Sequence, residues 1–166
     1  MLAGSLPEKI NFSRTVEEGN TIQGTIALWR FSRFALLVTE NDPFVEVSLG
    51  FRKDMQQQIE AIGSAAVRVQ LLCQKCLELL DYEVVVEVRT ILVRDREALD
   101  LLTPSKDGIV VTSTLVDPVD IFEDELILDL PMAPRHESSG CTVSTSSESG
   151  DLTRQPFAGL SKLMKD

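Results

Sequence analysis

The sequence predicts an α+β fold with a mainly antiparallel sheet, a C-x-x-C hairpin and a few short helices. Two segments with the alternation of β-strands, at 66–72 and 82–93, flank the C-x-x-C pair. Adjacent strands usually pair, so the two segments should form an antiparallel hairpin with the cysteines near its tip. Further along the chain, Asp117-Pro118 has the signature of a helix start.

At 166 residues the chain has the length of one domain with a tail. We predict a single α+β domain over residues 1–137. The remainder, 138–166, is predicted to be a flexible Ser/Gly-rich tract followed by a short C-terminal helical segment. The first residues lack the basic and apolar regions of a secretory signal, and no segment suits a membrane. With three cysteines, which do not make a disulfide framework, the default expectation is a cytoplasmic protein.

The N-terminal part contains short apolar runs. Residues 1–26 are predicted to form an edge strand from Lys9 to Phe12 and a loop. From Ala27 to Val38, apolar residues recur at helical spacing without Gly or Pro, which predicts one short amphipathic helix.

This predicted helix carries Trp29, Arg30 and Arg33 in an interleaved pattern. Guanidinium groups bind phosphate and aromatic rings stack on bases, so one interpretation is an RNA-contacting face. The other interpretation is a helix packed on the core with two solvated arginines.

The sheet is predicted from alternating or valine-rich segments, with a connection of about nine residues around the C-x-x-C pair. These segments are Phe44–Arg52, a weaker strand or turn at Gln56–Ile62, Ala66–Leu72 and Tyr82–Val93. A charged connector follows, with a helical turn around Glu97–Leu102 and a short strand at Ile109–Val111.

An acidic helix is predicted from about 118 to 130, with Asp117 as its N-cap and Pro131 as its stop. Between Asp117 and Asp151 there are nine acidic residues and one basic residue, so this region holds most of the net charge of −10. Such charge opposes binding of bare nucleic acid and suits a basic partner. The predicted docking residues are Asp120, Glu123, Asp124, Glu125 and Asp129; a solvated helix face is the alternative.

The cysteines and the sole histidine form the pattern C-x2-C-x59-H-x4-C. Thiolate and imidazole are the usual zinc ligands, and C-x-x-C lets one turn present two sulfurs to one ion. No cofactor is certain, and a structural zinc ion is one interpretation; free thiols packed without metal are another. A thioredoxin-like role fits poorly, because that motif should open a helix. The candidate ligands are Cys73, Cys76, His136 and Cys141.

No signature of an enzyme appears. The phosphate-binding glycine motifs are absent, and His136 lies in a Pro-rich turn without a nucleophile elbow. We therefore predict a protein that is not an enzyme.

Three ordered motifs carry a resemblance to a known family. They are the segment Leu71–Glu78 around the C-x-x-C pair, the run Asp117–His136 followed by Cys141, and Pro156–Leu163 near the end of the chain. Together they resemble the YceD family of large ribosomal RNA subunit accumulation proteins.

The resemblance implies a non-enzymatic factor for large ribosomal subunit biogenesis, needed for accumulation of large-subunit rRNA. The acidic residues between Asp117 and Asp151 suggest contact with a basic ribosomal protein, such as a small basic large-subunit protein, or with a precursor large subunit. Contact with rRNA would then be indirect, and no membrane partner is expected. The rival hypothesis is a direct rRNA-binding module that uses the Arg/aromatic helix at 28–35.

Overall fold

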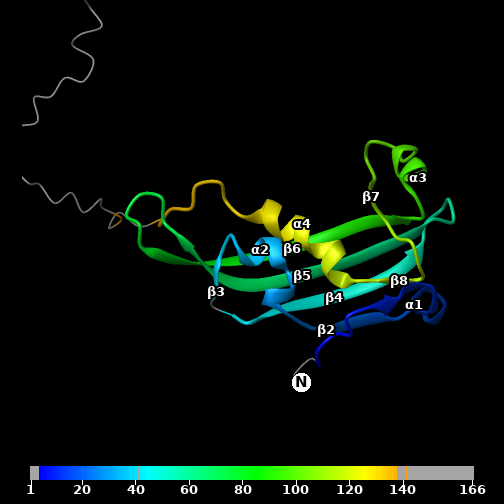
Figure 1. Ribbon diagram of the computed structural model, residues 1–166, viewed down its shortest axis with the longest axis horizontal. Coiled ribbons are helices and arrows are strands. Elements are labelled where there is room, and N and C mark those ends of the chain that lie inside the picture. Colours follow the sequence, from blue (N-terminus) through cyan, green and yellow to red (C-terminus); the bar gives the residue numbers. More distant parts are fainter. Residues whose placement is uncertain (1–3, 41, 138–140, 142–166) are drawn as a thin grey trace, which may run out of the picture.

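The computed structural model describes residues 4–40, 42–137 and 141, and its main element is a long twisted sheet (Figure 1). The strand order is β2-β4-β5-β6-β7, and β3 adds to β5 beside this path. Neighbouring strands are antiparallel except β6 and β7, which are parallel. The predicted α+β class with a mainly antiparallel sheet is therefore confirmed. The strands are β2 Thr21–Ala27, β3 Thr39–Glu40, β4 Phe44–Lys53, β5 Ile59–Leu72, β6 Leu79–Val93 and β7 Asp107–Val110.

Short elements complete the fold. Strand β1 (Ile10–Asn11) pairs antiparallel with β8 (Leu115–Val116) in a separate small sheet. In the described ranges, no helix is long and apolar enough to cross a membrane. The helices are α1 Phe12–Glu18, the 3₁₀ helix η1 Leu28–Arg30, α2 Ser32–Ala35, α3 Arg96–Asp100 and α4 Pro118–Asp129.

The sheet has one covered face and one open face. Alternate residues of the strands point to opposite faces, and one set is buried together with side chains of α2 and α4. In Figure 1, α4 and α2 lie across this covered face. The open face carries small and polar side chains such as Ser48, Ser64 and Ala66. The most deeply buried side chains include Phe31, Phe34, Leu49, Val69, Val84, Phe122 and Leu126.

Helix α4 forms where the sequence predicts it. The Asp117 side chain accepts a hydrogen bond from the Val119 N–H, and Pro118 occupies the first turn. Phe122 and Leu126 are fully buried against the sheet. Gly63 of β5 makes this approach possible, because a Cβ atom there would lie 2.9 Å from the Phe122 ring. The helix that carries the acidic residues is thus fixed to the sheet by its apolar side.

The predicted single helix over Ala27–Val38 is wrong. The segment divides into η1 and α2, and Phe31 between them has φ −81° and ψ 73°, outside the helical region. Leu28, Phe31 and Phe34 are all buried in the core. Burying these three side chains together requires a kinked backbone, so tertiary packing overrides the helical periodicity.

Other boundaries also differ from the predictions. The N-terminal edge strand is only two residues long, and the predicted loop contains α1 and β2 instead. Residues 59–72 form one continuous strand, β5, which joins the two segments predicted at 56–62 and 66–72, and the first three residues of the earlier segment belong to the turn before it. The connection between β5 and β6 spans six residues, Cys73–Glu78, and not about nine. Of the predicted tail 138–166, only Cys141 lies within the described residues.

The two ends of the long strands carry different chemistry. The β5–β6 connection holds the C-x-x-C pair at one end of β5, and the β4–β5 turn, Asp54–Gln58, lies at the other end. Figure 1 shows the two connections at opposite ends of the sheet.

Candidate metal centre and acidic surface

The β5–β6 connection forms a tight knuckle around Cys73 and Cys76. The Cys73 N–H donates to the Glu78 carbonyl at 2.9 Å, and the Leu77 N–H donates to the Cys73 carbonyl at 3.0 Å. Leu77 takes a left-handed conformation, with φ 61°, which turns the chain back toward β6. The knuckle therefore presents two sulfur atoms from one turn of the backbone.

The segment after α4 brings the remaining candidate ligands to this knuckle. The Gln74 N–H donates to the Pro134 carbonyl at 2.8 Å, which fixes the chain beside the hairpin tip. The Cys76 sulfur lies 3.3 Å from His136 Nδ1, and the Cys73 sulfur lies 3.5 Å from the Cys141 sulfur. All four ligand atoms lie within 4.8 Å of one another. The structure thus brings together the four residues that the sequence singled out.

The orientation of the His136 ring suits a ligand. Its Nε2 lies 3.2 Å from the Leu79 carbonyl, so Nε2–H donates to that oxygen, and in the neutral ring Nδ1 faces the sulfurs with its lone pair. Metal-binding histidines usually have their second nitrogen fixed in this way. The cluster therefore contains a defined imidazole donor beside three thiol groups that form no disulfide.

The pKa values of two thiols in the cluster, Cys73 and Cys141, are shifted in opposite directions. Burial opposes ionisation of Cys73, but hydrogen bonds from the backbone N–H groups of Cys76 and Lys75 lower its pKa to about 5. Burial, followed by the adjacent Cys73 and Cys76 sulfurs, raises the pKa of Cys141 to about 11. Hydrogen bonding to Cys73 raises the pKa of His136. One thiolate is therefore favoured, and further thiolates so close to it need a cation to offset their repulsion.

The donor set fits a divalent metal ion such as zinc. Four ligands at about 2.0–2.3 Å from a tetrahedral ion lie roughly 3.3–3.8 Å apart. Two separations between ligand atoms in the cluster, 3.3 and 3.5 Å, agree with this spacing. Cys73 and Cys141 are buried, while Cys76 and His136 are partly exposed. The cluster can hold a metal, and four protein ligands would leave no open position for a substrate.

The acidic residues of α4 do not all face solvent. Asp120, Asp124 and Asp129 are exposed and Glu125 is half-buried, whereas Glu123 is 7% exposed. Glu123, one of the predicted docking residues, is therefore largely buried and does not fit that prediction. Burial, followed by the charges of Asp117 and Glu123, raises the pKa of Asp120.

The arginines proposed as an RNA-binding pair instead bind these acids. Arg30 donates to both carboxylate oxygens of Asp117 at 2.9 Å. Arg33 contacts Glu123 at 2.8 Å and Asp124 at 2.7 Å. Trp29 is exposed, but it does not stack on either guanidinium among the described residues. The two predicted sites are thus adjacent, and their charges partly offset each other.

The outward side of α4 also carries apolar groups that sequence reasoning did not select. Asp120, Asp124 and Leu128 are spaced four residues apart, so they form one row along the helix. Leu128 is 75% exposed and Met132, just beyond the helix, is fully exposed. The spacing of four residues between Asp124 and Leu128 in the sequence could have predicted that Leu128 lies on the same side of the helix. We call the outward side of α4, with Met132, the acidic surface.

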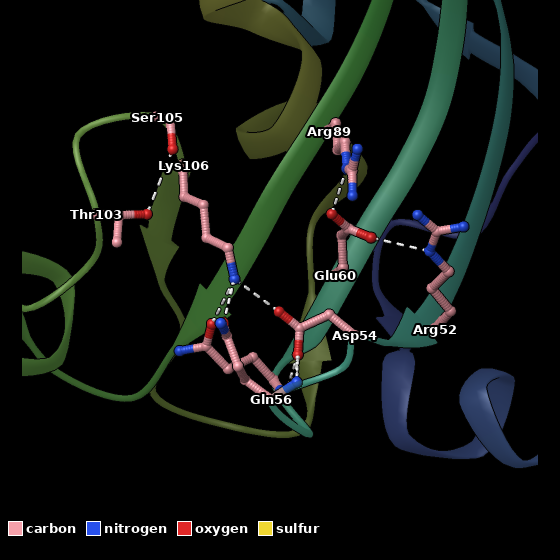
Figure 2. Close-up of polar contacts among 9 residues, drawn as sticks. Arg52, Asp54, Gln56, Glu60, Arg89, Thr103, Ser105 and Lys106 are labelled. Atoms are coloured by element: carbon pink, nitrogen blue, oxygen red, sulfur yellow. Dashed lines mark hydrogen bonds and ion pairs between the residues drawn. The ribbon is translucent and has the colours of Figure 1, made fainter.

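A second charged group missed by the sequence analysis lies at the far end of the sheet (Figure 2). Glu60 of β5 is 3% exposed and accepts hydrogen bonds from Arg89 at 2.5 Å and Arg52 at 2.8 Å. Nearby, the Lys106 ammonium binds Asp54 and the side-chain oxygens of two glutamines in the β4–β5 turn. The cluster of Glu60 with its two arginines becomes visible only from the strand register, which sets Arg52 opposite Glu60.

Comparison with known proteins gives a consistent result. The family model of the large ribosomal RNA subunit accumulation protein YceD matches residues 62–164. The chain is 31% identical over 126 residues to the large ribosomal RNA subunit accumulation protein YceD of Haemophilus influenzae, covering 71% of this chain and 72% of that protein. No solved structure matches the chain.

Proposed function

Because the chain belongs to the YceD family, we propose that it acts in the accumulation of large-subunit ribosomal RNA, through contact with a protein partner. The family is named for accumulation of an RNA and not for a catalytic activity. The partner is a basic ribosomal protein or a precursor of the large ribosomal subunit. The main observation in support of this proposal is the acidic surface of α4. The family description, which refers to large ribosomal RNA subunit accumulation, supports it as well.

The composition of the acidic surface supports a protein partner. Asp120, Glu125 and Asp129 form no ion pair among the described residues, so their charges are available. The exposed Leu128 lies among them and can act as an apolar contact with a charged rim, an arrangement typical of protein interfaces. Complementary charge speeds the encounter with a basic partner and selects against acidic ones.

The rival RNA-binding hypothesis for Trp29, Arg30 and Arg33 has less support. Both guanidinium groups are engaged with carboxylates, and Arg30 has only 15% of its side chain exposed. An RNA strand at this point would also approach the carboxylates of α4. These contacts favour a protein partner over RNA at this surface.

The test uses the full chain in a strain from which its gene is deleted. Asp120→Lys with Asp129→Lys should abolish co-sedimentation with precursor large subunits and lower the level of large-subunit rRNA. The matched control, Glu17→Lys with Glu97→Lys, changes net charge equally at exposed carboxylates on α1 and α3. Thermal unfolding of both variants checks that the fold is kept.

Two results would count against the proposal. Unchanged co-sedimentation of the α4 variant, or equal loss in the control, would remove the acidic surface as the docking site. Normal large-subunit rRNA in the deletion strain would remove the role itself. Leu128→Ala provides a further check, because loss of an exposed apolar contact should weaken the complex without changing charge.

We propose further that the ion held by Cys73, Cys76, His136 and Cys141 is a structural zinc. The four ligand atoms meet, and the ion would connect the β5–β6 knuckle to the segment after α4. Zinc-binding free energy would then contribute to folding. At this site the ion would neutralise the thiolates and hold two distant parts of the chain together.

Metal analysis of the purified full chain tests this proposal. We expect about one zinc per chain, a cobalt derivative with the absorption of a tetrahedral thiolate site, and a lower melting temperature after chelation. Cys76→Ser should lose the ion, whereas Glu137→Gln, an exposed change beside His136, should keep it. A chain that binds no zinc on reconstitution, and whose melting is insensitive to chelator, would refute it.

A further inference from the structure

We propose that the arginine pair of Arg52 and Arg89 binds a phosphate group of an RNA backbone, at the end of the sheet opposite the metal cluster. This inference deepens the proposed function, because it adds a direct RNA contact to a factor that docks through protein. It rests on three features of the pair: a shared buried carboxylate, guanidinium edges that remain available, and a local excess of positive charge.

The shared carboxylate holds both guanidinium groups in place. Arg52 lies opposite Glu60 in the β4–β5 ladder, and Arg89 lies opposite Ile62, one step along the same face. Each arginine donates to Glu60 through its Nε atom. Figure 2 shows one guanidinium on each side of the Glu60 carboxylate. Two flexible side chains are therefore positioned before any ligand arrives, which lowers the entropy lost on binding.

The bonds to Glu60 leave part of each guanidinium available. Among the described residues, the terminal amino groups of Arg52 and Arg89 make no further hydrogen bond. Their side chains are 57% and 69% exposed. The pair of terminal amino groups on a guanidinium matches two oxygens of a phosphate, so each arginine retains a phosphate-binding edge.

The local charge balance is positive although the chain is acidic. Two guanidinium groups share one carboxylate, so the three side chains together carry one excess positive charge. Lys106 does not contribute, because it is neutralised by Asp54 in the adjacent turn. An opposing carboxylate, Glu87, lies two positions before Arg89 on the same face of β6. The excess of one positive charge at the pair favours an anion between the two guanidinium groups.

The shape of the site favours a polymer over a small anion. A surface depression of about 470 Å³ borders the arginines, and Met55 at its rim is fully exposed. A site for a small anion usually encloses its ligand. Here the donors are more than half exposed, so a strand passing over the surface can place a phosphate between them. The occupant we commit to is therefore RNA.

A binding titration with the full chain and a labelled RNA oligonucleotide tests the inference. Arg52→Gln with Arg89→Gln should weaken binding at low salt by roughly fivefold or more, as expected for loss of two exposed charge contacts. The slope of log affinity against log salt should fall by about 0.7, the value for one neutralised phosphate on a single strand. Arg68→Gln is the control for Arg52→Gln alone and for Arg89→Gln alone, because each change removes the charge of one exposed arginine on the same face of the sheet.

The possible results separate this inference from the proposed function. No RNA binding by the unmodified chain, or equal weakening by Arg68→Gln, overturns the inference even if α4 variants lose co-sedimentation. Displacement of the RNA by inorganic phosphate at equal concentration also overturns it, since that result indicates a small-anion site. Weakening confined to the Arg52 and Arg89 variant supports it, whether or not the acidic surface is the docking site. Thermal unfolding of each variant confirms that the fold is retained.

Discussion

Replacement of Gly63 by alanine tests how α4 is held on the sheet. A Cβ atom at this position would lie 2.3 Å from the Ser48 carbonyl oxygen and 2.9 Å from the Phe122 ring. The first contact is with backbone of the neighbouring strand, so β4 and β5 must move apart. The second is with a fully buried ring, so α4 must move outward.

The expected loss of stability follows from these contacts. Inserting a methyl group into a packed core costs about 1–3 kcal/mol. The lower entropy of unfolded alanine offsets about 0.4–1 kcal/mol of this. We therefore expect Gly63→Ala to lose a net 1–2 kcal/mol, roughly, which lowers the melting temperature of a domain of this size by about 2–8 °C.

Urea unfolding followed by circular dichroism provides the assay. The control is Ser64→Ala, the next residue of β5 on the open face, which should change stability by less than about 0.5 kcal/mol. Adding Phe122→Leu to Gly63→Ala should cost less than the sum of the single changes, because a smaller side chain relieves one contact. If Gly63→Ala is as stable as the control, the close approach of α4 to the sheet is refuted.

Three further predictions concern charged groups. Arg33→Ala should destabilise the chain by about 1–3 kcal/mol in urea unfolding, because the buried Glu123 loses its charged partner; an unchanged midpoint would contradict this. For Glu60, burial opposes ionisation, but hydrogen bonds from its two arginines lower its pKa, so its stabilisation is present above the ordinary pKa and is lost as pH falls through the lowered one. Glu60→Gln should therefore cost about 1–2 kcal/mol at neutral pH and progressively less in acid, and a difference that does not vary with pH would disprove the assignment. Lys106→Met should speed amide hydrogen exchange in the β4–β5 turn, whose side chains bind that ammonium, and equal exchange in both proteins would rule out this role.

The parts of the fold that depend on local chemistry could be predicted from the sequence. Helix α4 begins and ends as expected because Asp117 caps it and Pro131 stops it. Helix α1 had a similar local signal that the prediction did not use, since the Asn11 side chain caps it and Gly19 ends it with φ 64°. The kink at Phe31 could not be foreseen, because it results from burial against residues distant in the sequence.

The candidate sites likewise contain residues that the sequence identifies and contacts that depend on the folded chain. The four metal-cluster residues could be selected because soft ligands are few in this chain, but their meeting depends on the path of the segment after α4. The arginine pair could not be found, because alternation alone does not give the register that sets Arg52 opposite Glu60. Glu123 was predicted as a docking residue although it is buried. The reason is its pairing with Arg33, which lies 90 positions away in the sequence and cannot be seen in the helical pattern.

The position of α4 in the chain determines the order in which the structure can assemble. Within the part of the chain that the structure describes, every strand of the larger sheet precedes α4, and two contacts that fix the helix join residues 87 and 90 positions apart. A chain made from its N-terminus therefore completes these strands before the helix that covers them emerges, and domains generally fold as they are synthesised. Until then, the apolar side of the sheet remains open to other nascent or unfolded chains. Assembly of this protein is thus most vulnerable to aggregation in the interval before α4 is made.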